Sequence, residues 1–271
     1  MVTTAEKVAA FRAAHRLGQP LLLANAWDVG SARFLAGLGF EALATTSSGF
    51  AATLGRRDYR VTRDEALTHA AALVGATDLP VSADLENCFA DDPAGAADTV
   101  TRAVSIGLAG CSIEDFTGDS ANPIYDIGIA TERVAAAAEA AHRDGDFVLT
   151  ARAENHLHGI QDLPDTIARL QRFSEAGADV LYAPALSTID DIRAVVTAVD
   201  KPLNVLTVPG LPSIAELASA GVARVSVGGA FAFVALGAVA RAGRELLDAG
   251  TYGWLEVARD ARRTVAESFE S

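Results

Sequence analysis

Cysteine and lysine are scarce in this sequence, and both shortages narrow the possible chemistry. The two cysteines among 271 residues, Cys88 and Cys111, fit neither a disulfide framework nor the paired spacing of a structural zinc site, so a reducing cytoplasm is the expected location. Proline is also sparse, with nine residues, and half of the chain is apolar. This composition excludes intrinsic disorder as the main state.

Basic side chains are outnumbered by acidic ones, 22 to 35, which gives a net charge of −13. A surface of this sign repels nucleic acid and anionic lipid, so neither is an expected partner. The most apolar stretch, Val225 to Ala240, has 16 residues and three glycines. It is shorter than the roughly 20 residues that cross a bilayer, so we interpret it as a buried helix or a subunit contact.

Eight apolar runs of strand length recur along the chain, separated by Ala/Leu-rich helical patterns. The predicted strands are Pro20–Ala26, Ala42–Thr46, Pro80–Asp84, Gly110–Glu114, Phe147–Arg152, Val180–Ala183, Leu203–Thr207 and Arg224–Val227. Strands that alternate with helices run parallel and are buried on both faces. We therefore predict an α/β fold, a (β/α)₈ barrel, with a doubly wound open sheet as the alternative.

No linker or low-complexity segment divides the chain, so residues 1–271 are predicted to form one domain. Residues 230–271 exceed the single helix that an ideal barrel needs after its eighth strand. We expect this C-terminal helical extension to pack on a neighbouring subunit.

Acidic side chains cluster where two neighbouring strands end, the place where barrel enzymes keep their reactive groups. Asp84 and Glu86 end the third strand and are predicted to point to the same side, and Glu114 ends the fourth. Oxygen ligands without His or Cys favour Mg²⁺ or Mn²⁺, held partly through water. The alternative is that these acids cap helices or pair with arginines.

Other strand ends carry groups that suit an anionic ligand. Arg152, in TARAENH, can clamp a carboxylate, and the segment from Thr45 through Ser48, Gly49 and Phe50 offers backbone N–H groups. SVGG at the eighth strand end suits either phosphate binding or close helix packing. Asn204 lies in the seventh strand, and the sequence does not fix whether it faces inward.

The positions of the lysines and of Cys88 disfavour a Schiff-base mechanism and an activated cysteine nucleophile. Lys7 lies in the first helix and Lys201 at the opposite end of the barrel from the strand C-termini, so a Schiff-base mechanism is disfavoured. Cys88 has no adjacent histidine and is interpreted as structural. His156 and His158, which follow Arg152, fit acid–base work and a surface role equally well.

These motifs, taken together, resemble the isocitrate lyase/phosphoenolpyruvate mutase superfamily over nearly the whole chain. The resemblance rests on LLLANAWDVGSARFLAGLGFEALATTSSG followed by Arg57-Asp58, and on VSADLEN, GCSIED, LTARAEN and PLNVL, in the family's order. It implies a barrel that binds Mg²⁺ and an α-keto acid or its enolate. It also implies a homo-oligomer, a dimer or tetramer, in which a C-terminal helix is exchanged between subunits.

The resemblance assigns roles to particular positions. Asp84, Glu86 and Glu114 resemble the metal-site acids, Asp58 completes the site, and Asp58, Arg152 and Glu114 form the catalytic group. The substrate contacts would be Ser48, Gly49, Phe50, Trp27, Asp84, Arg152 and Asn204, with Asp28 beside Trp27 at the first strand end.

One segment departs from the family. Isocitrate and methylisocitrate lyases carry K-(K/R)-C-G-H after the fourth strand, whereas residues 116–126 here contain no cysteine, lysine or histidine. Asp119 or Tyr125 is the expected proton-transfer residue in this loop. The leading function is a Mg²⁺-dependent lyase for a small α-keto or 2-hydroxy di- or tricarboxylate. The alternatives are carbon–phosphorus chemistry on phosphonopyruvate and non-catalytic binding of an α-keto acid.

Overall fold

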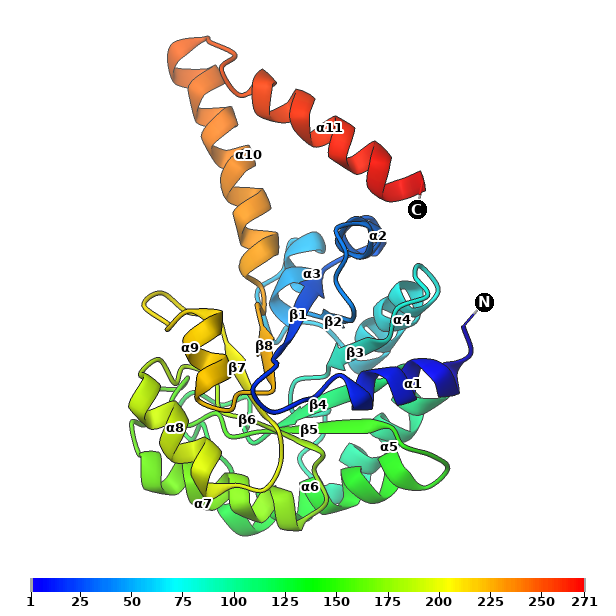
Figure 1. Cartoon of the computed structure of the whole chain (residues 1–271), viewed down its shortest axis with the longest axis vertical. Coiled ribbons are helices and arrows are strands. Elements are labelled where there is room, and N and C mark those ends of the chain that lie inside the picture. The colour runs from blue at the N-terminus through cyan, green and yellow to red at the C-terminus, as the bar shows by residue number, and fades with distance from the viewer. Residues whose placement is uncertain (1, 271) are drawn as a thin grey trace.

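The eight strands close into one parallel barrel in sequence order, β1 to β8, with β8 pairing back to β1 (Figure 1). The computed structural model describes residues 2–270. The strands are β1 (Leu21–Ala26), β2 (Leu43–Thr45), β3 (Val81–Asp84), β4 (Gly110–Glu114), β5 (Val148–Arg152), β6 (Val180–Tyr182), β7 (Leu203–Leu206) and β8 (Arg224–Ser226). The predicted (β/α)₈ barrel is confirmed.

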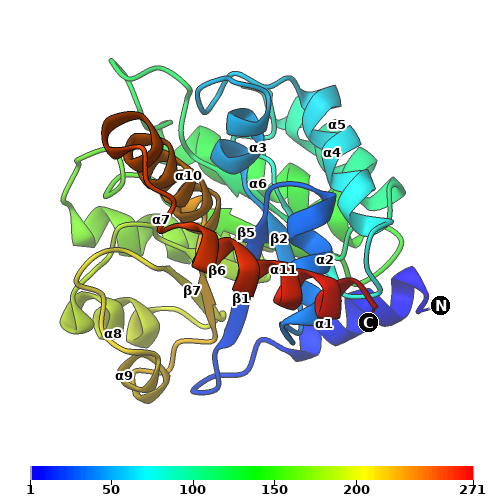
Figure 2. The same cartoon turned by 90° about the horizontal axis from the view of Figure 1, so that it is seen from above.

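Eleven helices accompany these strands within residues 2–270, and most of those that follow a strand surround the barrel (Figure 2). They are α1 (Thr4–Ala13), α2 (Val29–Gly37), α3 (Ser47–Thr53), α4 (Arg63–Val74), α5 (Pro93–Ser105), α6 (Ile127–His142), α7 (Leu163–Glu175), α8 (Ile189–Ala198), α9 (Ile214–Ser219), α10 (Ala230–Ala249) and α11 (Leu255–Glu270). A Ser, Thr or Asp side chain caps the N-terminus of each helix from α1 to α9. These caps accept otherwise unpaired backbone N–H groups.

Two apolar cores hold the barrel. The larger core lies between the strands and the surrounding helices. The smaller one fills the interior at the N-terminal end of the barrel, where Phe11 of α1 packs with Leu21, Leu23, Val148 and Val180. A Cβ at Gly110 would lie 3.0 Å from the Phe11 ring and 2.5 Å from the Val148 carbonyl oxygen, so the absence of a side chain there allows the smaller core to pack closely. The cavity of the barrel lies on the C-terminal side of this smaller core.

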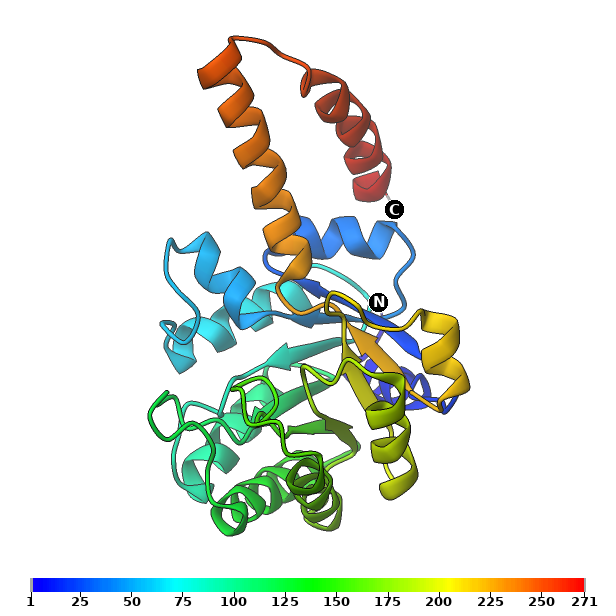
Figure 3. The same cartoon turned by 90° about the vertical axis from the view of Figure 1, so that its left-hand side faces the viewer.

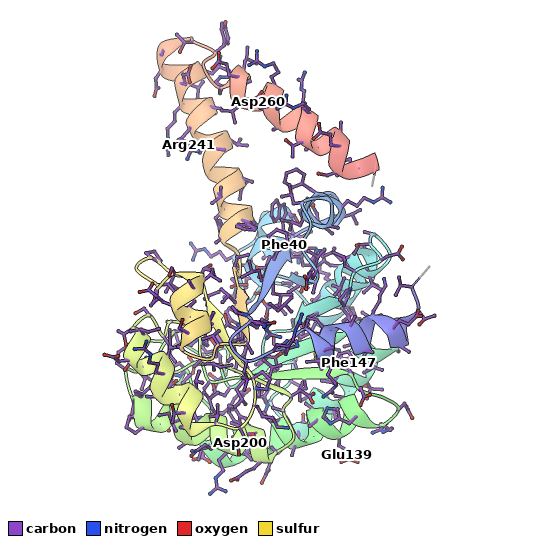
Figure 4. The ribbon with its side chains drawn as sticks, viewed as in Figure 1. Phe40, Glu139, Phe147, Asp200, Arg241 and Asp260 are labelled. Atoms are coloured by element: carbon purple, nitrogen blue, oxygen red, sulfur yellow. The ribbon has the colours of Figure 1, made fainter. Side chains whose placement is uncertain are left out.

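Helices α10 and α11 form an arm that projects from the barrel near the end where β8 finishes (Figures 1 and 3). Helix α10 buries only Ala232, whereas Phe233, Val234, Leu236, Val239 and Leu247 are exposed. Arg241 on α10 and Asp260 on α11 mark the two halves of the arm (Figure 4). Helix α11 returns to pack on α2, where Ser268 lies against Gly37.

None of the helices described is both long and apolar enough to cross a membrane.

Candidate active site

A cavity of about 220 Å³ opens at the end of the barrel where the strands finish. Polar side chains from strands and from the loops that follow them make up much of its wall. These are Asn25, Thr45, Thr46, Ser47, Ser48, Asp58, Tyr59, Ser82, Asp84, Ser112, Glu114, Thr150, Arg152, His158, Tyr182, Asn204, Arg224 and Ser226. The cavity therefore combines an acidic group, two arginines and a ring of hydroxyls.

Arg152, the last residue of β5, contacts three carboxylates. Its Nη1 lies 2.8 Å from Glu114 Oε1 and 3.3 Å from Asp84 Oδ1, and its Nε lies 2.6 Å from Glu154 Oε1. The Tyr182 ring lies beneath the guanidinium, 4.7 Å away. Parallel register places these groups on adjacent strands, because Glu114 pairs with Arg152 and Arg152 with Tyr182. Arg152 is thus held rigidly, as a carboxylate clamp requires.

Asp84 is anchored at the mouth of the cavity. The Ser47 N–H donates to its Oδ2 over 3.0 Å, and its own N–H donates to Thr45 Oγ1 over 2.9 Å. Among the predicted acids, Asp84 and Glu114 therefore pair with an arginine, and Asp84 also accepts the N–H of Ser47, the first residue of helix α3. The aspartates at the N-cap positions themselves are Asp28, Asp92, Asp126 and Asp162.

Glu86 does not follow the strand alternation that we expected. Strand β3 ends at Asp84, and Glu86 adopts φ 51° in the turn beyond. Its side chain lines a small hollow behind Asp84 instead of the main cavity. Its Oε1 is buried without a hydrogen-bond partner among the described residues, and burial together with Asp84 raises its pKa to about 8.

The pKa values of Asp58 and Glu114 are also raised. Burial and the nearby Asp84 raise the pKa of Asp58, which lines the cavity. Burial raises the pKa of Glu114 against the opposing effect of Arg152. Carboxylates crowded with too little positive charge, and a buried oxygen without a partner, are what a divalent cation would relieve.

The donor set fits a hard cation such as Mg²⁺, because it consists of oxygen atoms only. Residues 2–270 contain no group of three or more His, Cys, Asp or Glu side chains close enough to cage a metal. Mg²⁺ does not need such a cage, since it usually keeps several waters and takes one or two carboxylates. Asp84, with Asp58, Glu86 and Glu114 around it, suits that mode of binding.

The predicted substrate segment forms the first turn of helix α3, not an open loop. Gly49 N–H donates to the capping Thr46 Oγ1, and Phe50 N–H donates to the Thr46 carbonyl. Ser48 lines the cavity and lies 3.2 Å from Thr46 Oγ1, whereas Phe50 stacks on His69. Of the predicted contacts Ser48, Gly49 and Phe50, Ser48 lines the cavity, as do the preceding Thr45, Thr46 and Ser47.

Two further predicted contacts lie in different places. Trp27 stays outside the cavity lining, where its carbonyl oxygen lies 3.0 Å from His69 Nε2, and Asp28 caps α2. Asn204 faces inward, donates to Ser226 Oγ and accepts from Arg224 Nε. In the SVGG segment, the N–H groups of Val227 and Gly228 both donate to Asn25 Oδ1.

The loop 116–126 turns its expected proton-transfer residues away from the cavity. Asp119 bonds within its own loop, and the Tyr125 hydroxyl donates to Asp91. Sequence reasoning missed Tyr59, which follows Asp58 and donates to Glu114 Oε2 over 2.9 Å. Tyr59 and His158 both contact the Phe116 ring, and both line the cavity.

Both cysteines are free and buried, and burial raises the pKa of the Cys88 thiol to about 12. Neither cysteine lines the cavity. Cys88 therefore has the environment of a structural residue.

Comparison with known proteins places this chain in a family. The model of the phosphoenolpyruvate phosphomutase family matches residues 11–247, and the chain belongs to that family. A protein of Mycobacterium tuberculosis without an assigned function is 35% identical over 240 residues, 88% of this chain and 89% of the relative. Escherichia coli 2-methylisocitrate lyase is 30% identical over 202 residues, 72% of this chain and 67% of that enzyme.

Among solved structures, a lyase/mutase candidate from Burkholderia cenocepacia J2315 superposes with a TM-score of 0.92 at 50% identity, covering 96% of this chain and 95% of the other. The resemblance drawn from the sequence motifs is confirmed. Relatives with named activities include lyases and mutases, so the chain belongs to an enzyme family whose reactions vary between members.

Proposed function

We propose that this protein is a Mg²⁺-dependent lyase that cleaves a carbon–carbon bond of a small α-keto or 2-hydroxy di- or tricarboxylate. The observation that carries the proposal is Arg152, fixed between Asp84 and Glu114 at the wall of the cavity. A relative of 30% identity is a 2-methylisocitrate lyase, which supports carbon–carbon cleavage.

A divalent cation held by Asp84 and its neighbouring acids would supply Lewis-acid stabilisation of negative charge on an enolate oxygen. Arg152 binds the substrate carboxylate, and the Ser48 hydroxyl of helix α3 hydrogen-bonds it. Phe116 is stacked on His158 and edge-on to Tyr59, and it thereby holds these two side chains at the cavity wall.

Cleavage of a 2-hydroxy acid moves two protons. The hydroxyl proton leaves to a base as the carbon–carbon bond breaks, the electron pair of that bond forms the enolate, and the enolate then takes a proton. The Tyr59–Glu114 pair and His158 are the proton-holding groups that line the cavity. They replace the loop residues that lysine- and cysteine-bearing relatives would use.

Carbon–phosphorus chemistry on phosphonopyruvate is the second candidate, because the matching family model is that of a phosphomutase. The same arginine and metal-site acids would serve it. The absence of lysine from residues 116–126 weakens this candidate, since a phosphonate calls for cations.

A substrate panel tests the proposal. Purified protein with Mg²⁺ is incubated with oxaloacetate, isocitrate, 2-methylisocitrate, 2,3-dimethylmalate and phosphonopyruvate, and products are followed by NMR. Cleavage of a carboxylic acid that stops on chelation supports the lyase. Phosphate release from phosphonopyruvate favours the alternative, and binding without turnover of any compound favours a non-catalytic α-keto acid binding protein.

The variant Asp84→Ala should abolish metal-dependent turnover with the fold intact by circular dichroism. Asp119→Ala is the matched control, because that carboxylate lies outside the cavity, and it should keep wild-type turnover. Turnover retained in Asp84→Ala would refute the metal site.

We further propose that the protein is a homo-oligomer, a dimer or tetramer, assembled through the α10–α11 arm, and that it works in the cytoplasm. The apolar side chains exposed along α10 support the assembly.

A further inference from the structure

Arg224 lies buried in the barrel interior and bonds only to side chains that carry no negative charge. Its Nε donates to Asn204 Oδ1 over 2.9 Å and its Nη2 to Thr150 Oγ1 over 3.0 Å. Its Nη1 lies 3.1 Å from His15 Nε2, and burial and Arg224 lower the pKa of His15 to about 3, so this imidazole is neutral at pH 7. Among residues 2–270, no carboxylate forms an ion pair with Arg224.

Arg224 differs from the other arginines that are buried or nearly buried. Arg152 has three carboxylates around it. Arg133 is buried too, but it donates to the backbone carbonyls of Glu114, Asn87 and Ala90, lies over the Tyr125 ring and does not line the cavity. Arg169, also buried, pairs with Asp115 and Asp165 and does not line the cavity, so Arg224 is the one of these four arginines that lines it without a carboxylate beside it. A buried cation of this kind is costly unless an anion joins it.

The wall around Arg224 is neutral and rich in hydrogen-bonding groups. Thr150, Ser226 and Asn204 border it, and Ser112 stands beside Thr150 on the neighbouring strand. The acids of the site lie nearer the mouth, at the ends of β3 and β4. Thr150 and Arg152 are successive inward-facing residues of β5, about 6.6 Å apart along the strand. Arg152 therefore lies near the mouth of the cavity, and Arg224 lies one layer of side chains deeper.

We propose that the floor of the cavity, formed by Arg224, Thr150, Asn204 and Ser226, is a subsite for the distal carboxylate of a short dicarboxylic acid. The proximal carboxylate lies at Arg152, so this inference rests on the proposed function and narrows its substrate class. A monocarboxylic acid of the same length leaves Arg224 without its anion and binds more weakly.

Succinate and butyrate test this subsite, because they have the same chain length and differ by one carboxylate. Calorimetric titration of the whole protein with Mg²⁺ should show at least tenfold tighter binding of succinate. In Arg224→Met the preference should disappear through loss of succinate affinity, with butyrate affinity unchanged. Arg224→Lys keeps the charge and should retain part of the preference.

Folding is followed separately, by circular dichroism and melting temperature. If Arg224→Met does not fold, Thr150→Val takes its place, since it removes an acceptor that orients the guanidinium and should reduce the succinate preference in the same direction. Equal binding of the two acids by wild type, no binding of either, or a preference kept in the variant would overturn the proposal. Chloride is also tested as a competitor of succinate at matched ionic strength. If chloride removes the preference for succinate over butyrate, the floor of the cavity is a site for an inorganic anion and not for a carboxylate.

The succinate and butyrate titration and the substrate panel can fail independently of each other. Chelation of Mg²⁺ should weaken both acids by a similar factor and leave their ratio unchanged, because Arg224 lies away from the metal-site acids. A protein that turns over no compound of the panel but keeps the ratio would refute the lyase and preserve the subsite.

Discussion

Tyr59 places a phenol proton within the acidic group of the cavity, 2.9 Å from Glu114 Oε2. Tyr59→Phe removes this hydrogen bond but keeps the ring that contacts Phe116. If the phenol takes part in proton transfer, kcat should fall by about 10²-fold with a small change in KM, measured on the substrate that the panel identifies. Tyr252→Phe, at an exposed position on the arm, should be neutral. An unchanged kcat in Tyr59→Phe would remove this residue from the mechanism.

His15 makes stability depend on pH. Burial lowers the pKa of His15 to about 3, so between pH 6.5 and 3 the unfolded chain binds a proton that the folded protein does not. The free energy of unfolding contributed by this residue therefore falls as pH drops, by at most about 1.4 kcal/mol per pH unit. Urea unfolding at pH 7 and pH 5 should show a shallower pH dependence for His15→Gln than for wild type. Equal slopes would contradict this account.

At the scale of elements, helix α3 positions the site and depends on Gly49. A Cβ there would meet Thr46 Cγ2 at 2.5 Å and Trp27 Cβ at 3.0 Å. Gly49→Ala should displace α3, lower stability by about 1–3 kcal/mol and weaken substrate binding through Ser48, as measured by unfolding and by KM. Gly75→Ala is the control, because its nearest neighbour would lie at 3.6 Å. Similar losses in both variants would show that α3 is not the cause.

The strands show which features of the fold can be predicted from the sequence. Eight apolar runs suffice to predict eight strands, because parallel strands are buried on both faces. The inward direction of Asn204 needs the barrel register, which depends on partners far along the chain. The side chain of Glu86 does not point to the same side as that of Asp84, because β3 ends at Asp84 and Glu86 has a left-handed backbone conformation.

The same limit applies to the site. Motif positions are enough to predict that Arg152, Asp84 and Glu114 meet, since strand ends of a barrel converge. Tyr59 and His158 come from loops after different strands, and both contact the ring of Phe116. Loop conformations of this kind leave no periodic signal in a sequence.

At the scale of the whole molecule, the arm is the feature that a single chain does not explain. Leu247 is 85% exposed and Val239 68%, on a helix that buries one residue. Each such side chain gains about 1.5–3 kcal/mol when it is fully buried. Exposure of this extent on a helix that projects from the barrel is typical of a subunit interface.

The double variant Val239→Glu/Leu247→Glu should therefore dissociate the oligomer. Light scattering after size exclusion should give a multiple of 28.0 kDa for wild type and 28.0 kDa for the variant, with helical content retained. Leu17→Glu, which changes a leucine about as exposed as Val239 in the turn before β1, should leave the oligomer intact. A monomeric wild type would refute assembly through the arm. Because Gly229, just before α10, lines the cavity, dissociation should also lower substrate affinity, which links assembly to the site.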